Sequence, residues 1–168
     1  MKDPTIVDNM LKGANQVMVN KMAADFVTEA EKATLSQTFT AGTFGYDTIV
    51  DAISKLNIED ESQIFIVIPN AWKADLRKDD DYKSARMGEV IYNGQVGTIC
   101  GIPVIATKAL EDAAYVMTKE AITLFMKQDV EVEQDRDPDK RQNSVYLRTA
   151  YVVALTDATK ICEITVAA

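Results

Sequence analysis

The first thirty residues follow a helical pattern of hydrophobic and polar positions. Asp3 and Pro4 supply a capping residue and a proline for the first turn. Apolar residues then recur three and four positions apart, at Ile6, Val7, Met10, Leu11, Ala14, Val17, Met18, Met22, Phe26, Val27 and Ala30. This spacing predicts one long amphipathic helix from Pro4 to about Lys32, with its methionines filling the core. At 1.5 Å per residue the helix is about 40 Å long, enough to run the length of a domain.

The middle of the chain mixes both periodicities. A Thr- and Gly-rich connector with one short strand is expected over 34–44, and a second helix over 46–56. The continuous apolar run 63–68 predicts a buried strand, followed by a helix over 71–78 that Asn70 caps and that places Trp72 in the core. Two short strands around a turn at Gly101 are expected within 94–107.

Strand patterns fill the C-terminal third. Strands are expected over 113–118, 121–125, 129–133, 145–155 and 160–166, with a charged turn over 135–142. The segment 129–133 alternates acids with valines, which predicts a strand with one face in water. The order of helix, mixed α/β region and antiparallel strands predicts an α+β fold.

Composition narrows the function classes. The 168 residues contain 47% hydrophobic residues, enough for one domain or two small lobes that share a core. A net charge of −8 argues against broad non-specific binding to nucleic acid. Histidine is absent, which excludes Ser-His-Asp and Cys-His catalysis and the usual zinc motifs. We expect a protein that is not an enzyme and has no metal or cofactor.

Cysteines and the N-terminal sequence bear on the compartment. Cys100 and Cys162 are far apart and belong to no CxxC motif, so two reduced, packed thiols are expected, with a long-range disulfide as the alternative. The N-terminus has no apolar signal-peptide core, and no apolar run approaches the ~20 residues that cross a bilayer. An intracellular, soluble protein without membrane contact is expected.

Three groups of residues invite a functional interpretation. The spacing of the glycines at 94, 97 and 101 matches neither GxGxxG nor GxxxxGK[ST], the two common nucleotide-binding motifs, so these glycines are expected in turns. Asp79, Asp80 and Asp81 lack the alternate spacing of a calcium loop and are expected in a solvated loop. A third group carries charges that suit contacts with another subunit rather than acid-base catalysis: Asp129, Glu131 and Glu133, with Arg136, Lys140, Arg141 and Arg148 as basic partners.

Several stretches in this order resemble the major capsid proteins of tailed bacteriophages, the HK97-like family. They are the long N-terminal helix, YDTIVDAISKL, IFIVIPNAWKADLRK, GQVGTICGIPVIATKAL, and the C-terminal strands including VYLRTAYVVALTD. The resemblance covers nearly the whole chain, and the strand-Pro-helix segment combined with G-x-x-G-x-x-x-G-I-P-V is its most specific part. It implies an HK97-like fold with a spine helix, a mixed α/β axial domain and antiparallel strands of a peripheral domain.

The resemblance also implies a domain plan and a role. It assigns 4–44 to the peripheral spine helix and connector, 45–119 to the axial domain, 120–156 to the peripheral strands and 157–168 to a C-terminal strand. The N-terminal arm and the E-loop hairpin of the family have no counterpart before residue 4, so a truncated copy is expected. Subunit contacts are expected in the 79–93 loop near the capsomer axis and along the charged hairpin, at Asp79, Asp80, Asp81, Tyr82, Arg86, Asp129, Glu131, Glu133, Arg136, Lys140 and Arg141.

The implied function is a structural subunit of an icosahedral phage or prophage shell. Its partners would be copies of itself in pentamers and hexamers, with a scaffolding protein and packaged DNA in the full-length context. Its location would be the virion capsid, after assembly in the bacterial cytoplasm. One alternative, an encapsulin-like nanocompartment shell, shares the fold and would hold a cargo enzyme. The other, a small α/β ligand-binding domain, would need a pocket with convergent polar groups.

Overall fold

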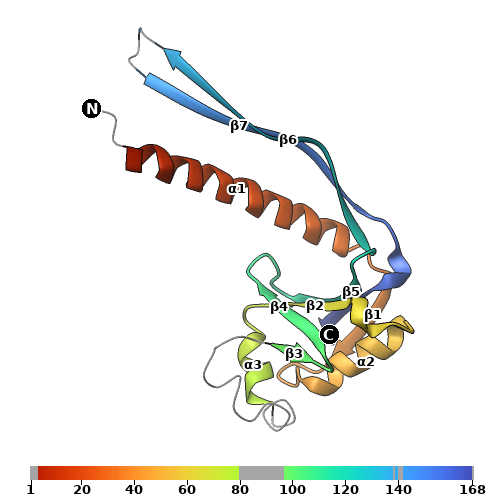
Figure 1. Cartoon of the computed structure of the whole chain (residues 1–168). Helices are drawn as coiled ribbons and strands as arrows, with labels where there is room; N and C mark the ends of the chain where they lie inside the picture. Colours follow the sequence, from red (N-terminus) through yellow and green to blue (C-terminus); the bar gives the residue numbers. More distant parts are fainter. Residues whose placement is uncertain (1–3, 80–96, 138, 140–141, 168) are drawn as a thin grey trace.

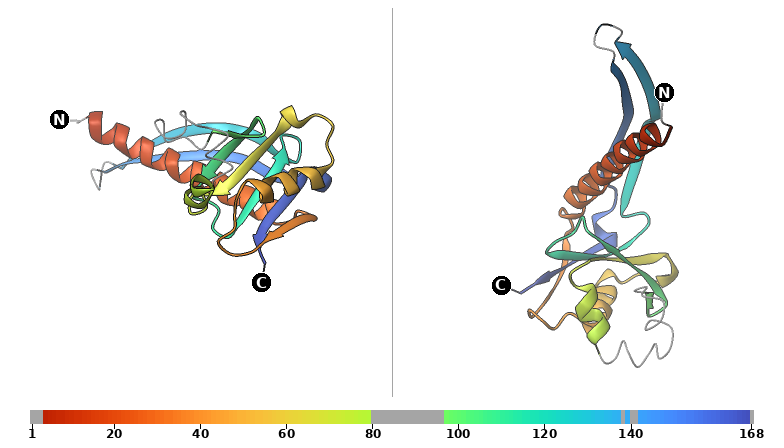
Figure 2. Two further views of the ribbon diagram at one scale, coloured as in Figure 1. Left: turned by 90° about the horizontal axis from the view of Figure 1, so that it is seen from below. Right: turned by 90° about the vertical axis from the view of Figure 1, so that its left-hand side faces the viewer.

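A computed structural model describes residues 4–79, 97–137, 139 and 142–167. The molecule has a mixed β-sheet domain from which a long helix and a two-stranded ribbon project in the same direction (Figure 1). Turned views show the helix and the ribbon running alongside each other away from the sheet (Figure 2). The predicted α+β class is therefore confirmed. No helix in these ranges is long and apolar enough to span a membrane.

Helix α1 (Pro4–Ala30) confirms the predicted long N-terminal helix. Its C-terminal end enters the core, where Ala30 is fully buried and Phe26 and Val27 pack beside it. The prediction that all its methionines fill the core is wrong, because Met10 is 67% exposed. At about 100° per residue the apolar positions spread around much of the helix, so one neighbour cannot cover them all.

The sheet domain joins segments that lie far apart in the sequence. Its strands are β1 (Leu35–Phe39), β2 (Ile64–Pro69), β3 (Thr98–Ile99), β4 (Ile102–Thr107), β5 (Ala113–Thr118) and β8 (Ile161–Val166), in the order β1-β8-β5-β2-β4-β3. The pairs β1–β8 and β2–β4 are parallel, and the other pairs are antiparallel. The central strands β2 and β5 are almost entirely buried, as their continuous apolar runs predict.

Two α-helices, α2 (Tyr46–Leu56) and α3 (Lys73–Lys78), pack on one face of this sheet over the larger core cluster. Two short 3₁₀ helices lie at Glu61–Gln63 and Ala158–Lys160. The larger core cluster includes Ile49 and Ile53 of α2 and Leu76 of α3. The rings of Phe39, Phe44 and Trp72 pack there in tilted and edge-to-face pairs, with centroids 4.9–5.3 Å apart. The other face holds a smaller cluster around Tyr115 and Met117, closed by the end of α1.

Local details correct some expectations and confirm others. Helix α3 begins at Lys73 and its N-cap is Trp72, so Asn70 does not cap it; the Asn70 amide donates to the Thr107 carbonyl instead, at 3.0 Å. Both cysteines are free, but only Cys162 is buried, whereas Cys100 is exposed at the β3–β4 turn. Gly101 has a φ of +81° at that turn, as predicted for a residue without a Cβ.

The ribbon consists of β6 (Ile122–Asp137) and β7 (Gln142–Leu155), paired antiparallel. The segments 121–125 and 129–133, expected as separate strands, form this one strand β6. Register shifts between Met126 and Gln128 and between Gln128 and Glu131 mark bulges, which bend a ribbon and increase its twist. The ribbon forms a sheet of its own, separate from the six-stranded sheet.

Candidate assembly surfaces

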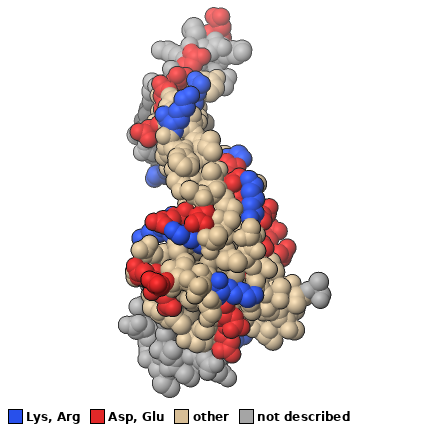
Figure 3. All heavy atoms as spheres, turned by 90° about the vertical axis from the view of Figure 1, so that its right-hand side faces the viewer, with Lys and Arg blue, Asp and Glu red and all other residues tan. Residues whose placement is uncertain are grey.

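The proximal part of the ribbon has large apolar side chains in solvent. Phe125 and Val152 lie directly opposite each other in the ladder and are 55% and 61% exposed. They border a hollow of about 400 Å³ that Met126, Lys127 and Tyr151 also line. On the side seen in Figure 3, uncharged residues cover the part of the projection next to the sheet domain, and charged residues flank them. Exposed apolar residues gathered in this way are typical of a surface that contacts another protein.

The distal part of the ribbon carries the predicted acids. Asp129, Glu131 and Glu133 are all exposed, and Gln128 donates a hydrogen bond to Glu131 at 2.6 Å. Arg148 lies opposite Glu131 in the strand ladder. The expectation that this strand has only one face in water is wrong, because Val130 and Val132 are exposed as well. The physical reason is that two strands alone have no layer to bury either face against.

Two hydrogen bonds hold helix α1 to strand β7. The Tyr151 hydroxyl donates to Asp25 at 2.7 Å, and the Leu155 amide donates to Glu29 at 3.2 Å. Lys21 forms an ion pair with Asp25. Bonds from Lys21 and then Tyr151 lower the pKa of Asp25, and bonds from Lys32 and then the Leu155 amide lower the pKa of Glu29. Both attachments lie in the C-terminal third of α1.

Asp79 makes an intramolecular contact. Its Oδ2 accepts a hydrogen bond from the Tyr46 amide at 2.6 Å, so it caps the N-terminus of α2 from the end of α3. The preceding Gly45 leaves room for this carboxylate, because a Cβ there would overlap with Oδ2. The sequence predicted Asp79 as a subunit contact; that role stays a prediction beside the cap.

Other predicted contact residues are only partly described. Asp80, Asp81, Tyr82, Arg86, Lys140 and Arg141 lie outside the described residues. Arg136 lies in β6 opposite Asn143, at the distal end of the ribbon. The ladder therefore brings together Glu131 and Arg148 of the predicted charged hairpin, while the placement of the remaining charges stays a prediction.

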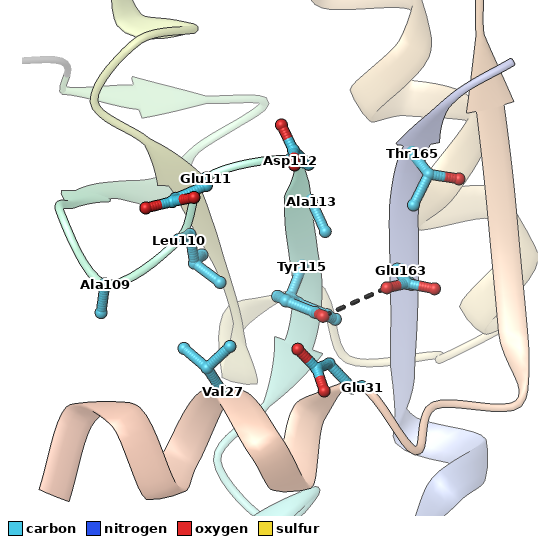
Figure 4. A pocket seen from close by; sticks show the side chains of 10 residues that line it. All are labelled: Val27, Glu31, Ala109, Leu110, Glu111, Asp112, Ala113, Tyr115, Glu163 and Thr165. Atoms are coloured by element: carbon cyan, nitrogen blue, oxygen red, sulfur yellow. Dashed lines mark hydrogen bonds between the residues drawn. The ribbon is translucent and has the colours of Figure 1, made fainter. Parts of the chain in front are cut away.

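A pocket of about 530 Å³ lies where the C-terminal end of α1 meets the sheet (Figure 4). Four carboxylates line it, from Glu31, Glu111, Asp112 and Glu163, beside the apolar side chains of Val27 and Leu110. The buried Tyr115 hydroxyl donates to Glu163 at 3.1 Å, and burial, together with this nearby carboxylate, raises the pKa of Tyr115. Sequence reasoning missed this pocket because its lining comes from three separate segments with no shared motif.

The pocket is lined by acidic, hydroxyl and apolar side chains. Its lining contains no basic side chain and no cysteine. Among the residues with described positions, no group of histidine, cysteine and acidic side chains is arranged to hold a metal ion. The exposed apolar surfaces of α1 and the ribbon are the feature that is typical of contact with other proteins.

Comparison with known proteins agrees with this interpretation. No family model matches the chain. It is 29% identical over 119 residues to a major capsid protein of Staphylococcus phage phiMR11, a match that covers 68% of this chain and 43% of that protein. The fold matches the capsid of Cyanophage P-SCSP1u (TM-score 0.74, 12% identity, 99% of this chain and 66% of the other). It also matches the holo-SrpI encapsulin complex of Synechococcus elongatus (TM-score 0.72, 10% identity, 95% and 65%).

The structural matches span nearly all of this chain but less than two thirds of either neighbour's length, and the sequence match spans less than half of the phage relative. At such low identity, the structural matches establish only the fold. The sequence match shows in addition that the chain is similar to a phage capsid protein. The expected resemblance is confirmed on both counts: this chain has the HK97-like capsid fold and is similar in sequence to a phage major capsid protein.

Proposed function

We propose that this chain is a structural subunit of an icosahedral phage or prophage shell. The observation that carries the proposal is the projection of α1 and the β6–β7 ribbon, which exposes Met10, Val17, Phe125 and Val152 in a single copy. A monomer in solution rarely leaves such an extended apolar surface uncovered, whereas a shell subunit covers it with neighbours. In a closed ring, one surface patch of each copy contacts a different patch of the next copy, and this contact repeats around the ring.

The predicted domain plan belongs to this proposal. The peripheral domain would comprise α1 and the ribbon 120–156, and the axial domain would lie within 45–119. Strand β8 pairs with β1 on one side and with β5 on the other, so both strands would join the axial domain through the β8–β5 pairing. Five or six copies would pack around an axis through their axial domains, and the projections would contact neighbouring capsomers.

The proposed role is non-catalytic, and the proposed location is the virion capsid, with assembly in the host cytoplasm. A scaffolding protein and packaged DNA would be partners in the full-length context. The phage relative matches at 29% identity and the encapsulin structure at 10%, so the phage shell is the better supported of the two alternatives. Cargo that copurifies with the chain would favour the encapsulin alternative instead.

Electron microscopy of the purified chain tests the proposal. We expect negative-stain images to contain rings with five-fold or six-fold symmetry, or closed shells. Small particles without symmetry at every concentration would contradict assembly by this chain. If a specific small molecule then raised the melting temperature, a ligand-binding domain would replace the shell subunit as the interpretation.

A further inference from the structure

Strand β1 forms an edge of the six-stranded sheet. In the described part of the chain it pairs with β8 alone, at one end of the strand order. The Ala167 amide donates to the Phe39 carbonyl at 2.7 Å, so the backbone groups of Phe39 face β8. Because the backbone groups of alternate residues in a strand point to opposite edges, those of Gln37 also face β8, and those of Ser36 and Thr38 face outward. An edge of this kind presents N–H and C=O groups to any other extended strand.

The sequence of β1 favours pairing with another strand. From Ala33 to Tyr46 the chain contains no charged residue and no proline. Uncharged segments rich in β-branched and aromatic residues pair readily when they lie at an edge. If β1 strands of two copies met antiparallel, Ser36 of each would lie opposite Thr38 of the other, and the outward backbone groups of both residues would match. The edge therefore fits a second copy of the same strand.

Lys55 covers this edge from the neighbouring helix. Helix α2 lies against β1 (Figure 1), and Lys55 is in its last turn. The Lys55 Nζ donates to the outward-facing Ser36 carbonyl at 2.7 Å. Gln37 Nε2 donates to the Thr38 carbonyl at 3.4 Å. Both carbonyls that an incoming strand would use thus accept a side-chain hydrogen bond already, and a strand arriving there would have to displace or bury an ammonium group.

From these contacts we infer that Lys55 protects the β1 edge from pairing with β1 of a second copy. A lysine at a sheet edge prevents strand addition because its charge loses water when another strand covers it. Here the protecting charge comes from α2, since β1 has none of its own. The inference goes beyond the proposed function, because it concerns a surface that is kept out of self-association.

Removing the ammonium group tests the inference. Lys55→Met keeps a long side chain but loses the donor and the charge, whereas Lys55→Arg keeps both. Lys119→Met is the matched control, because Lys119 is exposed and follows β5, a strand that is paired on both sides. Hydrogen exchange of the segment 34–39 is measured by mass spectrometry at two protein concentrations, and light scattering gives the particle mass of each chain.

We expect Lys55→Met to slow exchange in this segment several-fold at the higher concentration, because the outward amides of Ser36 and Thr38 gain partners. Its particle mass should also exceed that of the unsubstituted chain. Lys55→Arg and Lys119→Met should match the unsubstituted chain in both measurements. Unchanged exchange and mass in Lys55→Met would overturn the inference.

A second substitution tests whether the association runs through β1. Thr38 is exposed, so Thr38→Lys places a charge on the edge strand itself. The Lys55→Met/Thr38→Lys chain should return to the exchange and the mass of the unsubstituted chain. Association that persists in this double variant would overturn the inference, since it would use another surface. If the unsubstituted chain stays monomeric while Lys55→Met associates through β1, the proposed function fails and this inference stands.

Discussion

Replacing Gly45 with alanine should destabilise the sheet domain through one carboxylate. An added Cβ would overlap with Asp79 Oδ2 and lie 3.2 Å from its Cγ, so the carboxylate must move. That movement breaks its hydrogen bond from the Tyr46 amide and leaves the N-terminus of α2 without this cap. The backbone at Gly45 is extended, with φ −156° and ψ −165°, so alanine itself introduces no torsional strain.

The magnitude follows from two opposing effects. Losing this cap leaves a partly buried amide without the carboxylate that it donates to, which costs about 2 kcal/mol. Replacing glycine with alanine restricts the unfolded chain and returns about 0.5 kcal/mol. We therefore expect Gly45→Ala to lower the free energy of unfolding by about 1–2 kcal/mol, which lowers the melting temperature by about 2–4 °C per kcal/mol.

Urea unfolding measured by Trp72 fluorescence reads this effect directly, because Trp72 packs against Phe39 and Phe44 in the same core. Gly13→Ala is the matched control: a Cβ there meets nothing within 4 Å, and the change should raise helix stability by about 0.5–1 kcal/mol. In an Asp79→Ala background, Gly45→Ala should cost nothing further, since the clashing carboxylate is gone. An equal cost in both backgrounds would refute the reasoning.

Three further predictions concern groups of known burial. A thiol reagent should label Cys100 in the folded chain and Cys162 only after unfolding, because Cys162 is buried and its pKa is raised by that burial; equal labelling rates would contradict the structure. The pKa of Glu29 is lowered, so its hydrogen bond from the Leu155 amide is intact above the ordinary pKa of 4.5 and weakens only as pH falls through the lower folded value. The hydrogen-exchange protection of the Leu155 amide, corrected for its intrinsic exchange rate, should therefore decline only in that acidic range. Leu76→Ala should cost about 2–5 kcal/mol in urea unfolding, since Leu76 is fully buried, and a cost near zero would show that α3 does not close the core.

The sequence was most informative where a segment is buried on the side that its periodicity indicates. Helix α2 and strands β2 and β5 are buried on sides that local patterns predict, and they match the predicted ranges closely. The turn at Gly101 was predictable for the same local reason, since a positive φ favours glycine.

Hydrophobic patterns failed to predict burial where it depends on contacts with other parts of the molecule. Met10 and Val132 have apolar spacing that suggests a core, yet both are exposed because no other described segment of this copy covers them. Long-range contacts were also out of reach: Asp79 bonds to Tyr46 across 33 positions, and Tyr151 to Asp25 across 126. No local spacing encodes such pairs, so the carboxylate cap and the link between helix and ribbon became visible only in the folded molecule.

The mass of the particle in solution tests the central claim most directly. Light scattering after size-exclusion chromatography should give five or six times the chain mass of 18.6 kDa, or the far larger mass of a closed shell. A particle that stays at 18.6 kDa over the whole accessible concentration range would contradict the claim that this chain assembles through its own surfaces.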